Sequence, residues 1–314
     1  MQVKFHRQIA EPIAGEAQIS AICFSPNCQK LAICIDRVVQ LYDDIGELRD
    51  QFATKPSDAK YGRQSYVVTG MDFSPDSTQL AIGQSDNIVY VYKIGSDWNE
   101  KKSIVAKFVQ SSHVTTLLWL PDGQVIFGLA DGKLRAGNVK KNKSITLFTA
   151  EQYTVALTAN VSRKAILSGH ADGSICRYII EDEGTGDRAG LVVRHSCAPC
   201  AIVWSAHGIL VGGCDRRVVI YGKDGKILQQ FDYSREANER DFSAGICNPT
   251  GTFLIGLAQA ESLSRTRTRM CLRLVRSRPT VFLSTEKGHV RRRTDERSEE
   301  HVHGHCHGLA IGYS

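Results

Sequence analysis

The chain has 314 residues, of which 42% are hydrophobic, and a formal net charge of +6 at pH 7. This composition is typical of a globular protein and argues against an intrinsically disordered chain. The sequence contains no apolar run long enough for a transmembrane helix, and its first residues lack the apolar stretch of a secretory signal, so we expect neither.

The positive charge is concentrated toward the C-terminus. Residues 261–314 contain eleven Lys and Arg residues against six Asp and Glu residues, so they carry +5 of the net charge. Residues 1–260 are close to neutral and lack the basic face that a nucleic-acid-binding protein presents to phosphates. We therefore expect no specific nucleic-acid binding by this part of the chain, whereas contact with a membrane stays open.

Six segments with a shared pattern follow one another along the chain, at 19–43, 66–93, 113–139, 153–179, 199–222 and from 242 onward. Aligning them on one aromatic or turn position gives spacings of 49, 46, 41, 44 and 43 residues, with the anchors Phe24, Phe73, Trp119, Asn160, Trp204 and Cys247. Repeats of about 40–45 residues are typical of WD40 blades. The longer spacings leave room for loop insertions.

Each segment predicts three β-strands. A first apolar run ends in a turn such as SPN, SPD or LPDG, whose Pro and Asp residues favour a reverse turn. A second apolar run, such as LAICI or VIFGLA, leads into a tight turn that contains an aspartate. A third run, such as VVQLYD or IVYVYK, closes the segment, and linkers such as 93–108 leave room for a fourth strand.

The aspartate of the tight turn recurs in the first five segments, as Asp36, Asp86, Asp131, Asp172 and Asp215. A short carboxylate in a turn can accept nearby backbone N–H groups, so we predict a structural role for these residues rather than a catalytic one. His170, which precedes Asp172 in SGHADG, is explained by the same turn. The sequence has no phosphate loop, GxSxG or HExxH motif, so we predict that the protein is not an enzyme and needs no cofactor.

The pattern as a whole predicts an all-β, WD40-type β-propeller over residues 1–258. About six blades are recognisable, the last of them incomplete, and we expect them to be part of a seven-bladed ring. A small antiparallel sheet cannot bury both of its faces alone, but radial stacking buries each face against a neighbour. Residues 3–9 are a candidate for the strand that closes the ring.

Residues 259–314 differ in character, because Arg dominates and no apolar run with an Asp turn appears. We expect this segment to be disordered. Two interpretations stay open: aberrant coding sequence from read-through, a retained intron or a frame error, which the abrupt change favours, and a basic arm for nucleic acid or anionic membranes. Its tract of His301, His303, His305, Cys306 and His307 could bind transition metals adventitiously, but a disordered tail lacks the fixed geometry of a defined metal site.

Ten cysteines are spread along the chain, and we expect them to be reduced thiols. Cys197 and Cys200 form one CxxC motif. A zinc site needs a second ligand pair at suitable spacing, and the nearby sequence supplies no Cys/His pair. We therefore interpret Cys197 and Cys200 as small core or turn residues and predict no metal site.

Four stretches, at 36–52, 54–95, 166–178 and 214–234, are far more specific to one family than the turn and strand pattern that WD40 repeats share. Among them are DRVVQLYDDIGELRDQF and CDRRVVIYGKDGKILQQFDYS. Because of these four stretches, residues 1 to about 258 resemble the N-terminal region of the intraflagellar transport protein 172 family. The resemblance implies tandem N-terminal propellers followed by a helical solenoid, of which this chain would contain part of the first propeller.

The resemblance also implies a function. Members of the family are non-catalytic scaffolds of the intraflagellar transport complex B, so the expected partners are other complex B subunits and, indirectly, the kinesin-2 and dynein-2 motors. The expected role is cilium assembly and cargo transport along the axoneme, with the protein in the cilium, the axoneme, the ciliary base and a cytoplasmic pool. The alternatives are a WD40 adaptor in a coat or ubiquitin-ligase assembly, a non-functional truncated product, and, least favoured, nucleic-acid binding through the basic tail.

Overall fold

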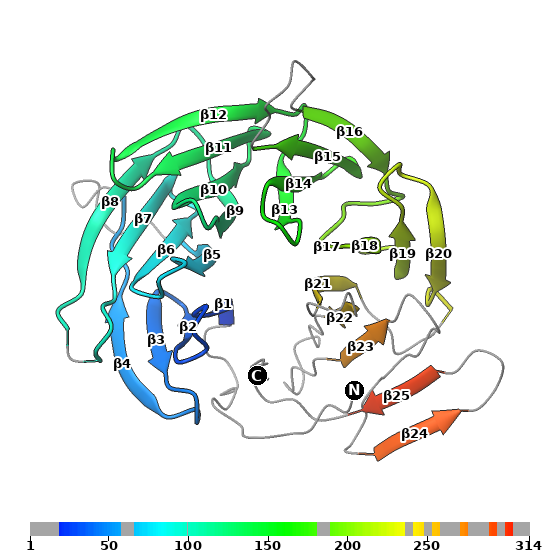
Figure 1. Ribbon diagram of the computed structural model, residues 1–314, viewed down its shortest axis with the longest axis horizontal. Coiled ribbons are helices and arrows are strands. Elements are labelled where there is room, and N and C mark those ends of the chain that lie inside the picture. The colour runs from blue at the N-terminus through cyan, green and yellow to red at the C-terminus, as the bar shows by residue number, and fades with distance from the viewer. Residues whose placement is uncertain are drawn as a thin grey trace. The chain divides into compact units, whose positions relative to one another are not determined.

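The computed structural model consists of strands and turns in the residues that it describes (Figure 1). These are 19–57, 66–98, 100–180, 189–235 and 241–247, with the strands at 253–257, 271–275, 289–293 and 299–303. Within them no helix has the length and hydropathy needed to cross a membrane. The chain divides between Leu157 and Thr158 into two compact units, which we call the N-terminal and the C-terminal unit.

The N-terminal unit contains three sheets, each with four strands hydrogen-bonded in sequence order. The first is β1 (Ile19–Phe24), β2 (Leu31–Ile35), β3 (Val38–Tyr42) and β4 (Leu48–Ala53). The second is β5 (Val68–Phe73), β6 (Gln79–Gln84), β7 (Ile88–Lys93) and β8 (Ser103–Val109). The third is β9 (Val114–Trp119), β10 (Gln124–Leu129), β11 (Lys133–Asn138) and β12 (Lys143–Thr149). The first strands β1, β5 and β9 lie side by side.

The C-terminal unit repeats this arrangement twice and adds shorter sheets. One four-stranded sheet, whose first strand crosses the division, is β13 (Thr154–Ala159), β14 (Ala165–His170), β15 (Ser174–Ile179) and β16 (Ala189–Arg194). The other is β17 (Ala201–Ser205), β18 (Gly208–Gly212), β19 (Arg217–Tyr221) and β20 (Ile227–Asp232). A three-stranded sheet is β21 (Phe242–Cys247), β22 (Phe253–Leu257) and β23 (Cys271–Val275), and a hairpin is β24 (His289–Arg293) and β25 (Glu299–His303).

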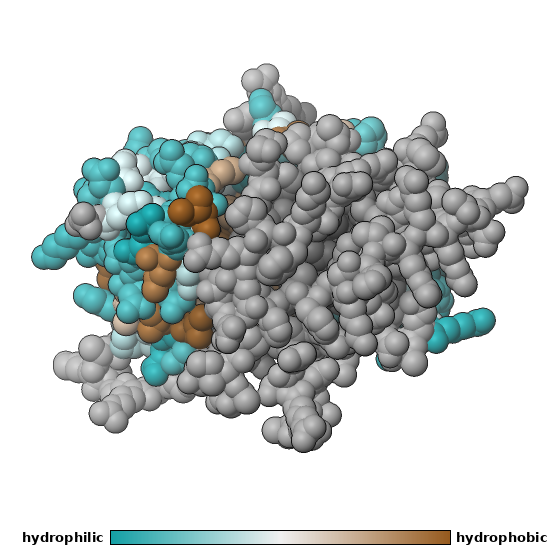
Figure 2. Space-filling view, turned by 90° about the horizontal axis from the view of Figure 1, so that it is seen from below, coloured by the Kyte–Doolittle hydropathy of each residue, from teal (hydrophilic) through white to brown (hydrophobic). Residues whose placement is uncertain are grey.

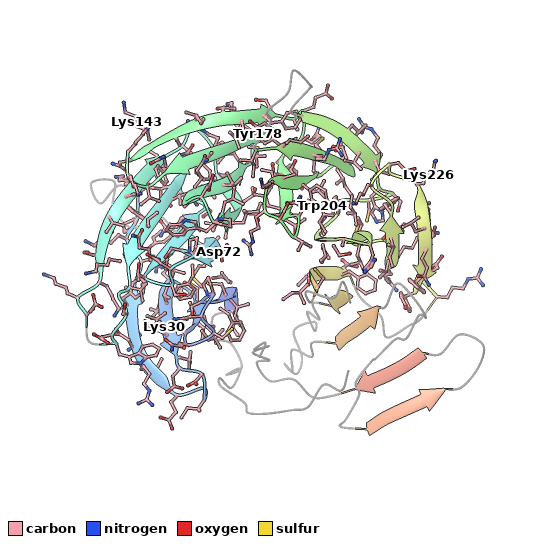
Figure 3. The ribbon with its side chains drawn as sticks, in the orientation of Figure 1. Lys30, Asp72, Lys143, Tyr178, Trp204 and Lys226 are labelled. Atoms are coloured by element: carbon pink, nitrogen blue, oxygen red, sulfur yellow. The ribbon has the colours of Figure 1, made fainter. Side chains whose placement is uncertain are left out.

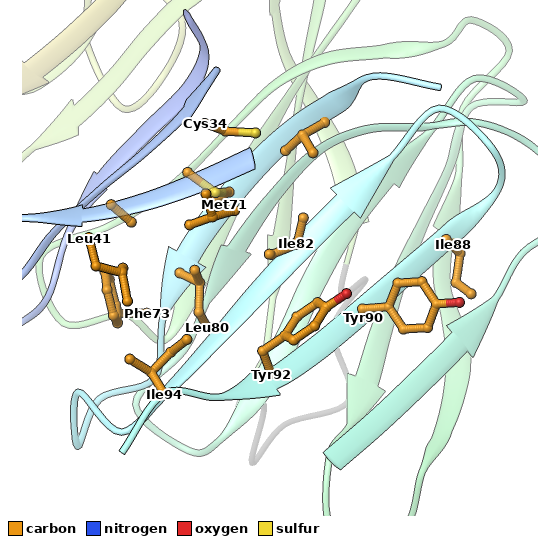
Figure 4. Packing of buried hydrophobic residues seen from close by; sticks show 13 residues of the cluster. Cys34, Leu41, Met71, Phe73, Leu80, Ile82, Ile88, Tyr90, Tyr92 and Ile94 are labelled. Atoms are coloured by element: carbon orange, nitrogen blue, oxygen red, sulfur yellow. The ribbon is translucent and has the colours of Figure 1, made fainter. Parts of the chain in front are cut away.

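The inner strands β6 and β7 of the second sheet are buried on both faces. Leu80 and Ile82 of β6 pack against the first sheet in a cluster that includes Leu41 and Phe73 (Figure 4). Ala81, which lies between them in sequence, packs on the opposite face with residues of the third sheet. Because successive strand residues point to opposite faces, a strand covered on both sides is apolar at most of its positions. This explains the continuous apolar runs of the sequence pattern.

The linker between the second and third segments contains a strand, since β8 occupies Ser103–Val109 and pairs antiparallel with β7. Three short strands, β23, β24 and β25, lie within residues 259–314. The other residues of that segment, and with them the expectation of disorder, lie outside the described residues. The candidate closing strand at 3–9 lies outside them as well.

Candidate functional site

The five turn aspartates occupy the same place in their sheets, the tight turn between the second and third strands. In each turn, the residue after the aspartate accepts a backbone hydrogen bond at its carbonyl oxygen from the residue that directly follows the fourth strand. With the N–H donor written first and the carbonyl acceptor second, the pairs are Thr54–Arg37, Gln110–Asn87, Ala150–Gly132, His195–Gly173 and Tyr233–Arg216. This repeated bond ties the end of every fourth strand to the Asp turn.

Three of the five carboxylates accept an N–H group two residues further along the chain. The pairs are Asp131 with Lys133 at 3.2 Å, Asp172 with Ser174 at 3.0 Å, and Asp215 with Arg217 at 3.1 Å. The other two aspartates have different partners: Asp86 accepts the backbone N–H of Ser57 at 2.7 Å, and Asp36 lies 3.8 Å from the Arg37 guanidinium. The turns place the five residues alike but do not give their carboxylates one common set of contacts.

Asp172 is held in its ionised form. The Ser174 hydroxyl donates to its carboxylate at 2.6 Å and is the main cause that lowers the pKa of Asp172 to about 2. The Ser174 N–H group and the Arg194 guanidinium, 2.7 Å away, act in the same direction, and partial burial opposes them. His170 is buried and pairs instead with Ser168, whose hydroxyl lies 2.9 Å from its Nε2.

Two polar side chains connect sheets within the N-terminal unit (Figure 3). Lys30 is only 3% exposed, and its Nζ donates to the carbonyl oxygens of Gly95 at 2.8 Å and Ser96 at 2.7 Å. Asp72 on β5 accepts the backbone N–H of Trp119, at the end of β9, at 2.7 Å. Buried polar groups of this kind rigidify a core when they are satisfied. These contacts join neighbouring sheets of the N-terminal unit.

The fourth strands carry large apolar side chains on the surface. Val109 of β8 is 64% exposed and Ile145 of β12 is 62% exposed. Leu191 of β16 and Ile227 of β20 are exposed in the same way. Figure 2 shows hydrophobic residues gathered among hydrophilic ones on one face of the described residues. Exposed apolar groups on hydrogen-bonded strands are suited to protein binding.

The segment between β16 and β17 contains both cysteines of the CxxC motif. Cys197 is half-buried and Cys200 is exposed. Ligand-type atoms of His195, Cys197 and Asp215 all lie within 4.8 Å of one another. Burial is the main cause that raises the pKa of the Cys197 thiol to about 12, and burial lowers the pKa of His195.

Sequence reasoning missed this cluster because it looked for a second ligand pair close in the chain. Asp215 comes from the turn between β18 and β19 and meets Cys197 only in the folded sheet. Two signals were available: the H-x-C spacing of His195 and Cys197, and the recurrence of the Asp turn beside Cys214.

The sequence matches a known repeat family and several known proteins. Residues 58–93 match the WD domain, G-beta repeat family. The chain is 53% identical over 256 residues to the intraflagellar transport protein 172 homolog of Mus musculus. The N-terminal four fifths of this chain match intraflagellar transport protein 172. The aligned part is 81% of this chain and 15% of the mouse protein, so the chain spans about a seventh of that relative's length.

More distant organisms contain proteins that match the same part of this chain. Intraflagellar transport protein osm-1 of Caenorhabditis elegans is 43% identical over 251 residues, which cover 80% of this chain and 14% of that protein. Intraflagellar transport protein 172 of Chlamydomonas reinhardtii is 40% identical over 264 residues, which cover 81% of this chain and 15% of that protein. The resemblance predicted from the four sequence stretches is confirmed.

A solved structure agrees on the fold. The crystal structure of the computationally designed Ika8 protein has a TM-score of 0.60, with 18% identity, and the match covers 90% of this chain and 78% of that chain. At this identity the likeness concerns the fold alone. Together with the WD40 repeat and the four-stranded sheets, it confirms the predicted all-β, WD40-type β-propeller class.

Proposed function

We propose that this chain is a protein-interaction scaffold in intraflagellar transport and acts within complex B. The observation that carries the proposal is the 53% identity over 256 residues with a protein named for intraflagellar transport. Because this chain corresponds to 15% of that protein, the proposal concerns the contribution of one folded binding module.

The partners and location follow from the same resemblance. We infer that other complex B subunits bind directly and that kinesin-2 and dynein-2 are reached indirectly. The module would work in the cilium, along the axoneme and at the ciliary base, with a further pool in the cytoplasm. We also propose that residues 1–258 act as the propeller module and that residues 259–314 are not part of the binding module, although β23 pairs with β22 of its last sheet.

Two structural features support binding rather than catalysis. The carboxylates of Asp131, Asp172 and Asp215 are occupied by N–H groups of their own turns, which favours the structural role proposed for all five turn aspartates. Exposed apolar side chains such as Val109 and Ile145 lie on the fourth strands of their sheets. We therefore propose a non-enzymatic role.

The test is mass spectrometry of the proteins that co-purify with the tagged full chain from ciliated cells. A Val109→Glu, Ile145→Glu double variant probes the fourth strands, and Val161→Glu, at a residue that is also 64% exposed but lies in a turn, is the matched control. The proposal expects complex B subunits with the chain and with the control. Recovery of only chaperones and proteasome subunits with the unaltered chain would overturn it.

A further inference from the structure

We propose that a basic surface, formed by the outer strand β8 and the turn between β11 and β12, binds an acidic, extended segment of a partner protein. Its members are Lys107, Lys140, Lys141 and Lys143, which we call the lysine surface, and all four residues are exposed. Lys143 begins β12 (Figure 3). The inference rests on the proposed scaffold function, since it assigns one binding surface to it, but it can fail separately because it is tested with purified protein.

The turn that carries three of the lysines has hydrogen bonds of its own. The side-chain oxygen of Asn138 accepts the backbone N–H of Lys141 at 2.9 Å. The backbone N–H of Asn142 donates to the carbonyl oxygen of Val139 at 3.3 Å. Asn142 has a φ of +49°, in the left-handed region that Asn adopts more readily than most residues. The turn is therefore a defined structure, and its lysines have defined positions in the backbone.

Two contacts hold this turn beside β8. The side-chain oxygen of Asn142 accepts the backbone N–H of Lys107 at 2.9 Å, across 35 residues of chain. Gly137, on β11, comes so close to β8 that an added Cβ atom would lie 2.7 Å from the ring of Phe108. Lys107 is thus a neighbour of the turn, and the four lysines gather on one part of the N-terminal unit.

The lysine surface has no acidic partner among the residues that the structure describes. In contrast, Lys133 of β11 pairs with Asp131 at 2.6 Å. The Lys107 ammonium group lies near neutral groups, 3.4 Å from the carbonyl oxygen of Ser57 and 5.8 Å from the centre of the Tyr90 ring. A cluster of like charges attracts a partner of opposite charge and speeds its association.

The fold itself does not require this cluster. The equivalent turn of the first sheet, between β3 and β4, instead contains the acidic residues Asp43, Asp44 and Glu47. Lysines inside an outer strand can protect its edge against pairing with other chains. Lys140 and Lys141 lie in the turn rather than in β12, so edge protection does not explain them. A negatively charged partner explains all four lysines.

Apolar side chains and a strand edge accompany the charges. Ile145 of β12 is 62% exposed and Val109 of β8 is 64% exposed. Among the described strands, β12 pairs only with β11, so its other edge offers backbone groups to which an extended segment can add. These features favour a protein segment that combines carboxylates with apolar residues. Nucleic acid is less favoured, because residues 139–149 contain no Arg and their one aromatic residue, Phe148, is half-buried.

The probe is a fluorescein-labelled peptide of alternating Glu and Val residues, and a peptide of alternating Lys and Val residues is its control. Fluorescence anisotropy measures the binding of each peptide to the full chain. The acidic peptide should bind at least about tenfold more tightly than the basic one, and added salt should weaken its binding. Equal binding of the two peptides would overturn the proposal.

Two double variants with the same change in charge test the position. Lys141→Glu with Lys143→Glu should weaken binding of the acidic peptide at least about tenfold. Lys223→Glu with Lys226→Glu alters two exposed lysines in the turn between β19 and β20 and should change binding less than about twofold. Thermal melting checks that both variants are folded. Equal weakening by the two variants would contradict the assignment to the lysine surface.

Because residues 259–314 are also basic, the place of binding is mapped directly. A benzophenone group on the acidic peptide is photo-cross-linked to the full chain, and mass spectrometry should find cross-links within residues 105–109 and 139–149. Cross-links confined to 259–314 would overturn the proposal. Vesicles of phosphatidylserine and phosphatidylcholine and a single-stranded DNA oligomer are the competing ligands. If Lys141→Glu with Lys143→Glu abolishes binding to either of these and leaves peptide binding unchanged, the partner is not an acidic protein segment.

Discussion

The carboxylate of Asp72 accepts a 2.7 Å hydrogen bond from the backbone N–H of Trp119, 47 residues away in the chain. Asp72 lies on β5 and Trp119 ends β9, so the bond joins two sheets of the N-terminal unit. A carboxylate that meets a backbone N–H forms one of the stronger hydrogen bonds in proteins. Asp72 therefore fixes the position of β9 against β5.

Replacing Asp72 with Ala should destabilise the protein. The Trp119 N–H group would lose its acceptor in a half-buried position, and we expect the free energy of unfolding to fall by about 1–3 kcal/mol. Urea denaturation measures the change. Asp122→Ala is the control, since Asp122 is exposed and its carboxylate accepts the Gln124 N–H within its own turn. Equal losses for the two variants would contradict the role given to Asp72.

Replacing Lys30 with Met should cost more than the same change at an exposed lysine. Met keeps the apolar stem but leaves the carbonyl oxygens of Gly95 and Ser96 without their donor. We expect a loss of about 1.5–3 kcal/mol, as for hydrogen bonds to charged groups. In Lys226→Met, at a side chain that is 82% exposed, the change should stay within about 0.5 kcal/mol. Thermal unfolding measures both changes, and a similar fall in melting temperature for the two variants would refute this prediction.

Gly173 and Gly123 form a matched pair for the turns. Both have a positive φ, +86° and +84°, so alanine is strained at either position. A Cβ atom at Gly173 would collide with the backbone carbonyl of His195, whereas at Gly123 it would meet nothing within 4 Å. Gly123→Ala should cost about 1 kcal/mol, and Gly173→Ala clearly more. If chemical denaturation gives equal losses of unfolding free energy for the two variants, the contact with the His195 carbonyl does not determine the cost at Gly173.

Asp172 should make stability depend on pH in the acid range. Its pKa in the folded protein is about 2, below the ordinary value of 3.8, so its contribution is complete above pH 4 and is lost as the pH falls toward 2. In Asp172→Asn this contribution is absent at every pH. The difference in unfolding free energy between the two proteins should therefore shrink between pH 4 and pH 2. A constant difference over that range would show that the Asp172 charge is unimportant.

The repeats and the strands inside them could be predicted because they depend on local pattern. The runs LAIGQ and IVYVYK predicted strands, and β6 and β7 occupy them. Their continuous apolar character indicated burial on both faces, which the clusters around Leu80 and Ala81 display. Local pattern was less informative for β8, whose alternating exposed and buried residues lie in a charged linker.

The polar contacts could not be predicted, since they join residues far apart in sequence. Lys30 follows a turn and looks like a surface residue, yet its Nζ reaches a carbonyl 65 residues away. The sequence led us to interpret Cys197 and Cys200 as small core or turn residues, and we did not infer from it that the fold brings His195 and Asp215 close to Cys197. Such contacts depend on the way neighbouring sheets stack, which a single sequence does not encode in any local signal.

The repeated bond behind the Asp turns has a consequence for engineering. It closes a loop of chain that contains the third strand, a hairpin turn and the fourth strand, and the loop differs in length from sheet to sheet while the bond persists. The extra length lies in the hairpin turn, which is longer between β7 and β8 than between β3 and β4, and the short β3–β4 turn exposes Ile45. A fluorescent label or an affinity handle inserted at that turn would report on the module while leaving its sheet clamped at both ends.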